Sequence, residues 1–147
     1  MTSQNRNGRK PRKRYLFSYG TLLPEHAPRE IAPTVRRLRR VGQGFVRGKL
    51  YDLGDYPGAV LTRNGPLIRG LVFALPDDPS VLEQLDRYEE FDSSRPNGSL
   101  FVRKRRVVNL QNGKKIVCWI YAYNGSTDTA SPLPSGRYTK AKNRASR

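Results

Sequence analysis

Two consecutive apolar segments joined by a short turn constrain the fold of this 147-residue chain more than any other feature. Residues 100–110 and 115–123 are rich in β-branched and aromatic side chains, which is typical of β-strands. The turn between them contains Asn112-Gly113, a dipeptide that favours a tight hairpin. We therefore expect these two segments to form neighbouring antiparallel strands.

Other apolar segments predict a sheet of about six strands, and most successive strands are linked by short turns. One clear helix is expected to begin at Asp78-Pro79, with Asp as the N-cap and Pro in the first helical position. A shorter helix is plausible over 34–40. Together these elements indicate an α+β fold with a strongly curled sheet or a small barrel. The remaining predicted strands are 14–19, 45–51, 59–61 and 68–75, with a hairpin at Asn64-Gly65 joining the last two.

Positive charge is concentrated at both ends of the chain. The net charge is +16, residues 1–14 carry six Lys or Arg and no acid, and residues 137–147 carry five and no acid. We expect one folded domain over 15–138 between two basic tails, 1–14 and 139–147. Tails of this composition are usually disordered and solvated. They can also add weak, non-specific affinity for nucleic acid, and that alternative stays open.

Several classes of protein are excluded by composition. No segment is apolar enough to span a membrane, so no membrane partner is expected, and the polar, basic N-terminus does not resemble a secretory signal. A single cysteine, Cys118, cannot form an internal disulfide, and a cytoplasmic location is the default. One Cys and one His (His26) are too few for a typical zinc site, so we expect no metal and no cofactor.

Two adjacent glutamates near the end of the predicted helix are not equivalent. A helix advances by about 100° per residue, which places Glu89 between Leu82 and Leu85 on the apolar side. Glu90 falls on the polar side with Glu83. A carboxylate directed toward a core at a helix C-terminus is disfavoured by desolvation and by the helix dipole, so its pKa should rise. This would suit a general acid/base, although an ion pair with an arginine or fraying of the helix end would also accommodate Glu89.

The segment Tyr19-Gly20-Thr21-Leu22 follows the first predicted strand. Successive backbone N–H groups in a turn that contains glycine can form a concave anion-binding site. A tight turn without any ligand is the commoner explanation of such a segment.

Several short motifs, in order along the chain, resemble those of the γ-glutamylcyclotransferase-like superfamily, including the small bacterial YtfP-like branch and the related butirosin-pathway cyclotransferase. The helix end is similar to the family block that ends in its catalytic glutamate, and Phe101-Val-Arg103 is similar to a later block in which tyrosine is usual in place of Phe101. The other segments that carry the resemblance are residues 15–22, 48–60, 70–75, 121–124 and 133–136.

This resemblance implies a mixed, barrel-like sheet with flanking helices, and an intramolecular reaction. The α-amine of a γ-glutamyl group attacks its own γ-carbonyl, which forms 5-oxoproline and releases the attached amine. The resemblance assigns proton transfer to Glu89 and binding of the glutamyl group to the backbone of Tyr19, Gly20, Thr21 and Leu22. No metal or cofactor is needed for this reaction.

Weaker expectations concern Tyr51, Tyr56 and Arg103, which could line a pocket or could serve in packing and ion pairs. Two other functions remain open. The first is a protein of the same fold that binds a small molecule without catalysis, since members of one fold can lose their chemistry. The second is a nucleic-acid-associated protein that acts through its basic tails.

Overall fold

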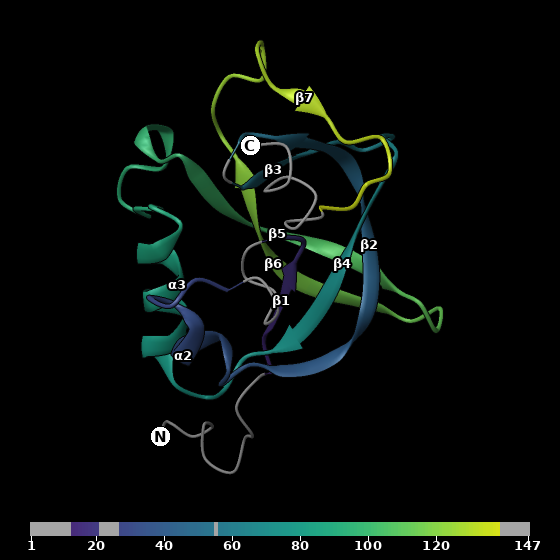
Figure 1. Ribbon diagram of the computed structural model, residues 1–147. Helices are drawn as coiled ribbons and strands as arrows, with labels where there is room; N and C mark the ends of the chain where they lie inside the picture. Colours follow the sequence, from purple (N-terminus) through teal and green to yellow (C-terminus); the bar gives the residue numbers. More distant parts are fainter. Residues whose placement is uncertain (1–12, 21–26, 55, 139–147) are drawn as a thin grey trace.

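The structure is a computed structural model that describes residues 13–20, 27–54 and 56–138 (Figure 1). Within these residues the chain forms seven strands, two α-helices and one short 3₁₀ helix. The strands are β1 (Tyr15–Ser18), β2 (Arg39–Asp52), β3 (Pro57–Leu61), β4 (Leu67–Ala74), β5 (Phe101–Leu110), β6 (Lys115–Tyr123) and β7 (Ser131–Pro132). The helices are α2 (Ala32–Val35), α3 (Pro79–Tyr88) and the 3₁₀ helix η1 (Pro96–Gly98).

Five strands form a closed barrel in the order β2-β4-β1-β6-β5. The barrel closes where β5 returns to β2, with Gly44 opposite Leu110 and Phe45 opposite Asn109. β1 and β6 run parallel, whereas the other neighbours are antiparallel, so the sheet is mixed. The helices lie against one side of the barrel (Figure 1). The predicted α+β fold, with a mixed, curled, barrel-like sheet and flanking helices, is confirmed.

Local signals predicted two elements wrongly. The hairpin expected at Asn64-Gly65 is not formed, because β3 and β4 pair with opposite edges of the 14-residue strand β2. The connection passes close to that strand: a Cβ on Gly65 would lie 3.1 Å from the Cα of Gly48. The helix expected over 34–40 ends at Val35, because Arg39 and the residues after it pair with β4.

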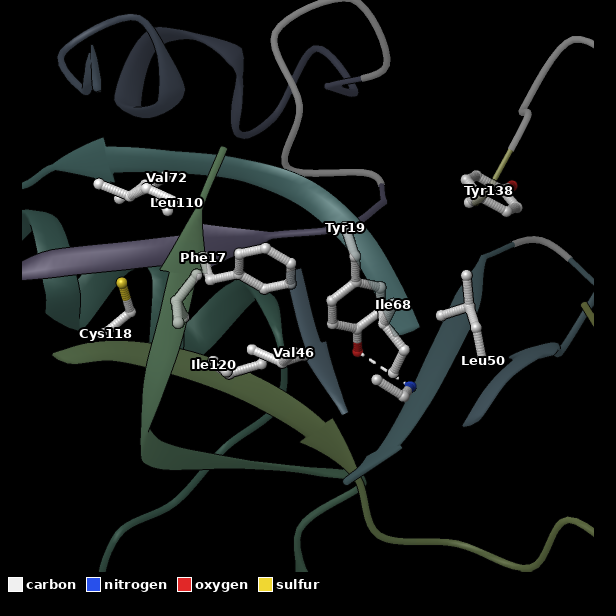
Figure 2. Close-up of a cluster of buried hydrophobic side chains, with 12 residues drawn as sticks. Phe17, Tyr19, Val46, Leu50, Ile68, Val72, Leu110, Cys118, Ile120 and Tyr138 are labelled. Atoms are coloured by element: carbon white, nitrogen blue, oxygen red, sulfur yellow. Dashed lines mark hydrogen bonds between the residues drawn. The ribbon is translucent and has the colours of Figure 1, made fainter. Parts of the chain in front are cut away.

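Two layers of apolar side chains hold the domain together. One fills the barrel, where Phe17 and Tyr19 point inward (Figure 2). The other lies between the barrel and the helices and contains Leu16. Since side chains alternate along a strand, Ser18 faces the helices, as Leu16 does. β1 therefore contributes alternate residues to both layers, and its C-terminal end lies beside the helical layer.

The surface of the described residues is strongly basic. Arg36, Arg37, Arg39 and Arg40 are exposed whereas Leu38 is buried. In the described part of the chain, no helix is long and apolar enough to cross a membrane. Most of the predicted tails fall outside the described residues, so the domain boundaries at 15 and 138 stay a prediction.

Candidate active site

Helix α3 carries the first component of the site, and capping fixes both of its ends. The carboxylate of Asp78 accepts a hydrogen bond from the backbone N–H of Ser80, and Pro79 starts the helix, as expected. At the other end the N–H of Phe91 donates to the carbonyl of Asp86 (2.9 Å), and the N–H of Glu90 donates to that of Arg87 (3.2 Å). These two bonds form a Schellman motif. Glu90 occupies its left-handed position, with φ 58°.

Glu89 is the C-cap residue of α3, one position before this left-handed turn. Its side chain is only partly accessible and lines a cavity. Burial, and secondarily the charge of Glu90, raises the pKa of Glu89 to about 8. A carboxyl group in this environment can hold a proton and release it near neutral pH. Its catalytic role stays a prediction.

The cavity lies between the end of β1, the end of α3 and the start of β5, and its volume is about 280 Å³. This is near the lower end of the usual range for small-molecule sites, which suits a small ligand. Aromatic rings and carboxyl groups both line it. The lining residues are Phe17, Ser18, Tyr19, Gly20, Glu30, Tyr56, Pro57, Tyr88, Glu89, Glu90, Leu100, Phe101 and Tyr121.

The end of β1 supplies the wall that faces α3. Tyr19 and Gly20 both line the cavity, whereas Thr21 and Leu22 lie outside the described residues. The Tyr19 hydroxyl is engaged inside the barrel: it donates to the carbonyl of Tyr121 (2.5 Å) and accepts from the N–H of Ala59 (3.1 Å; Figure 2). Gly20 has no room for a side chain, because a Cβ would collide with the ring of Pro57. The backbone at the end of β1 is thus the part of this segment that is available to a ligand.

Ser18 is the least expected residue of this wall. Its side chain is 3% exposed, and its hydroxyl oxygen has no hydrogen-bond partner among the described residues. Leaving a buried hydroxyl unpaired costs about 1–3 kcal/mol. Since Ser18 lines the cavity, a polar atom of a bound ligand can satisfy this group.

A polar cluster ties the end of α3 to the barrel. Asp86 accepts two hydrogen bonds from Arg103 (2.7 and 3.1 Å) and a third from the hydroxyl of Tyr121 (2.6 Å). The guanidinium of Arg103 also stacks on Trp119, 4.2 Å from the ring centroid. Burial, and then the bond to Asp86, raises the pKa of Tyr121 far above its usual range, so this hydroxyl remains a donor. Asp86 is three residues before Glu89, so the cluster holds the turn of helix that carries Glu89.

The charge at the cavity is opposite to that of the whole molecule. Three carboxyl groups, those of Glu30, Glu89 and Glu90, line it, and no Lys or Arg of the described residues does so. In a chain with a net charge of +16, this arrangement creates a local site that favours an ammonium group. An anionic group would have to be held by backbone N–H groups instead.

Sequence reasoning placed some of these residues and missed others. Of the three residues that could line a pocket or serve in packing and ion pairs, Tyr56 lines the cavity, Arg103 forms an ion pair with Asp86, and Tyr51 is not in the lining. Ser18, Asp86 and Tyr121 were not identified as site residues. The spacing of three between Asp86 and Glu89 was a signal, since such residues share a helix face. Nothing in the sequence pattern indicated that the hydroxyl of Ser18 would lack a hydrogen-bond partner among the described residues.

Cys118 is buried in the barrel, and burial raises the pKa of its thiol to about 12. It is not among the residues that line the cavity. In the described residues no group of three or more His, Cys, Asp or Glu side chains is placed to hold a metal ion. Among those residues, the cavity therefore offers carboxyl, hydroxyl and backbone groups as its polar chemistry.

A five-stranded mixed barrel, with a small cavity that is lined by a carboxyl group at a helix end, defines the class of this α+β protein. The family model described as "Gamma-glutamyl cyclotransferase, AIG2-like" matches residues 16–140. The chain belongs to this family, as the order of its sequence motifs predicts.

Solved structures of several proteins share the fold. An AIG2-like protein from Mus musculus superposes with a TM-score of 0.68 at 15% identity, covering 88% of this chain and 90% of that one. The YtfP protein from Escherichia coli gives a TM-score of 0.57 at 22% identity, with coverage of 87% and 98%. YkqA from Bacillus subtilis gives 0.66 at 18% identity, with coverage of 92% of this chain.

The chain spans only 43% of the length of Bacillus subtilis YkqA. No curated protein matches the chain significantly. At identities this low, the structural likeness establishes the fold, and the reaction must be argued from the site itself.

Proposed function

We propose that this protein cyclises a γ-glutamyl group of an amine or peptide to 5-oxoproline and releases the attached amine. The observation that carries the proposal is the carboxyl of Glu89, which lines a small cavity opposite the end of β1 and has its pKa raised to about 8. Membership in the γ-glutamyl cyclotransferase family supports the same reaction.

In the proposed reaction the ionised carboxylate of Glu89 takes a proton from the α-ammonium of the substrate. The free amine attacks the γ-carbonyl carbon, and a ring C–N bond forms. The ring nitrogen then still carries two protons, one more than in 5-oxoproline. Glu89 returns its first proton to the departing nitrogen, the bond to that nitrogen breaks, and the second proton of the ring nitrogen passes through Glu89 to the same amine, which leaves as an ammonium. No water is consumed, and the numbers of protons and electrons balance.

The surroundings of Glu89 suit each of these steps. The acidic lining of the cavity favours the α-ammonium, and the N–H groups at the end of β1 suit the α-carboxylate or the developing oxyanion. Because both reacting groups belong to one molecule, the protein needs mainly to fold the substrate and move a proton. A pKa near 8 keeps both forms of Glu89 accessible around neutral pH.

The test is the release of 5-oxoproline from a panel of γ-glutamyl amines and peptides by the wild type and by Glu89→Gln. Glutamine preserves the shape of the side chain but cannot transfer the proton, so we expect turnover to fall by about 100-fold or more. Glu83→Gln is the matched control, since Glu83 lies exposed on the same helix, and it should retain full turnover. Equal activity of the wild type and Glu89→Gln would exclude the proposed role.

A non-catalytic binding protein predicts a different result. The wild type would then release no 5-oxoproline from any member of the panel, yet γ-glutamyl ligands would raise its melting temperature.

A further inference from the structure

We propose that a second hollow, on the other end of β1 and beside β5 and β6, binds single-stranded nucleic acid. This hollow has a volume of about 280 Å³. Three cationic residues (Lys13, Arg14 and Arg105) and two aromatic residues (Tyr15 and Trp119) line it. Its remaining lining, residues 116–118, is uncharged.

The charge of this region is one-sided. Residues 101–123 carry six Lys or Arg and no acid. Among the described residues, Arg103 is paired with Asp86, whereas Lys104, Arg105 and Arg106 make no ion pair, and neither do the hollow's Lys13 and Arg14. An exposed strand with several uncompensated cations favours a polyanion, because each phosphate it contacts releases condensed counterions.

The side chain of Arg105 is already restrained in a position from which it can contact a phosphate. Its guanidinium lies 5.5 Å from the centroid of the Trp119 ring, and residues 105 and 119 are directly opposite each other on the two strands. Stacking restrains the long side chain but leaves the N–H groups of the guanidinium free to bind phosphate. Less conformational entropy is then lost when an anion binds.

The planar groups of the hollow favour a single strand over a duplex. Arg103 and Arg105 already lie over the Trp119 ring, 4.2 and 5.5 Å from its centroid, so the planar groups left for a base are the guanidinium of Arg105 and the ring of Tyr15. Unpaired bases can stack on aromatic and guanidinium planes inside a basic groove, whereas paired bases are hidden within a duplex. Val117, which lines the hollow, forms an exposed cross-strand pair with Val107. The two residues are 46% and 53% accessible and extend the apolar surface available to bases. An anionic membrane would meet the same charges, but a hollow of this size suits a base better than a flat layer of headgroups.

The sequence that precedes the hollow carries further positive charge. Residues 1–12 continue directly from Lys13 in sequence and carry four more Lys or Arg and no acid. The backbone of Arg14 is anchored to the sheet, because its carbonyl accepts a hydrogen bond from the N–H of Leu75 (2.9 Å). The sheet therefore fixes the backbone of the cationic side of the hollow at Arg14.

The nucleic-acid site and the candidate active site share no lining residue. Tyr15 lies at the first position of β1, whereas Ser18 at its last position lines the catalytic cavity. The two proposals can thus fail separately: Glu89→Gln should leave nucleic-acid binding unchanged, and substitutions in the hollow should leave the release of 5-oxoproline unchanged.

Trp119 is the single tryptophan of the chain, so its fluorescence reports on this hollow. The experiment titrates the full-length protein with a short single-stranded oligothymidine and follows both tryptophan emission and oligonucleotide anisotropy over a series of salt concentrations. We expect binding to quench the emission and to weaken steeply as salt rises.

Two triple variants distinguish the contribution of the hollow to binding from the effect of net charge. The first combines Lys13→Gln, Arg14→Gln and Arg105→Gln. The matched control combines Lys49→Gln, Arg63→Gln and Arg69→Gln, which removes the same charge from exposed residues that do not line the hollow. We expect the first variant to weaken binding by about tenfold or more and to make the slope of log affinity against log salt shallower by about 2, while the control keeps the wild-type slope.

Four results would overturn the proposal. The first is equal weakening in the two triple variants, and the second is oligonucleotide binding that leaves tryptophan emission unchanged. The third is tighter binding of a duplex of the same length, and the fourth is binding to phosphatidylserine vesicles without binding to the oligonucleotide.

Discussion

Glu89 makes the stability of the fold depend on pH. The pKa of this group rises from 4.5 to about 8 on folding. Between these values Glu89 is protonated in the folded state and ionised in the unfolded state, so the folded state binds more protons. The free energy of unfolding contributed by this group therefore falls as pH rises from 4.5 to 8, and is constant outside that window.

We expect the wild type to lose about 2–4 kcal/mol of stability relative to Glu89→Gln between pH 5 and pH 8.5. Urea unfolding of both proteins at the two pH values measures this difference. The groups common to both proteins cancel in the comparison. Parallel pH dependence in the two proteins would show that Glu89 is not desolvated in the folded state.

Ser18 offers a second test at the residue scale. Ser18→Ala removes a buried hydroxyl that has no partner among the described residues, so we expect the ligand-free protein to gain about 1 kcal/mol of stability. The same substitution should raise the KM for γ-glutamyl substrates several-fold, because a ligand atom loses its hydrogen bond. Thermal unfolding without ligand and steady-state kinetics check the two effects, and a less stable variant with unchanged KM would contradict both.

The Schellman motif at the end of α3 places a residue with a side chain where glycine is usual. Glu90 adopts φ 58°, a conformation that costs a non-glycine residue about 1–2 kcal/mol. This turn directs the chain away after Glu89 and brings a second carboxylate to the cavity. Glu90 is exposed, as the helical wheel predicts, yet it also lines the cavity and contributes to the raised pKa of Glu89.

We expect Glu90→Gly to stabilise the protein by about 0.5–1 kcal/mol, since glycine tolerates this conformation but has more freedom to lose on folding. Loss of the charge should also lower the pKa of Glu89 and shift the rise of activity to lower pH. Glu90→Gln separates the effects, because it should reproduce the shift in the pH profile without the gain in stability. Identical pH profiles for all three proteins would show that Glu90 does not act on Glu89.

Elements were predictable where local chemistry decides the structure. The helix starting at Asp78-Pro79 and the strands joined by Asn112-Gly113 form as predicted, because their caps and turns satisfy the backbone locally. Asn64-Gly65 carries an equally strong local signal, but tertiary pairing with both edges of β2 overrides it.

At the scale of the whole molecule, the helical wheel directed Glu89 to the apolar side of its helix, and the family resemblance assigned Glu89 and residues 19–22 to one substrate. Neither identified most of the residues that line the cavity. The residues that line this cavity range from Phe17 to Tyr121 and come from most of the chain. Their proximity depends on barrel closure, which has no local sequence signature. The unpaired hydroxyl of Ser18 and the bonds from Arg103 and Tyr121 to Asp86 are products of that closure, so only the structure shows them.

Charge is also organised at this scale. Carboxyl groups gather at one end of β1 and cations at the other, within a strand of four residues. Net charge and composition describe only the sum of these two regions. The sequence alone therefore suggested that the two basic tails are the surface available to a polyanion. The fold shows a second basic surface, within the described residues, at the hollow beside β5 and β6.

The parallel pairing of β1 with β6 has a consequence for biosynthesis. Leu16 is opposite Trp119, so more than 100 residues separate the two partners in the chain. On the ribosome β1 can pair with β4 once residue 74 has emerged, but its other edge stays unpaired for several further seconds at ordinary rates of translation. An open strand edge is a template for association with other chains. When β6 is synthesised, it pairs with this open edge of β1, and its residue Tyr121 completes the lining of the cavity. The nascent chain therefore loses its exposed strand edge and forms its ligand cavity in the same folding step.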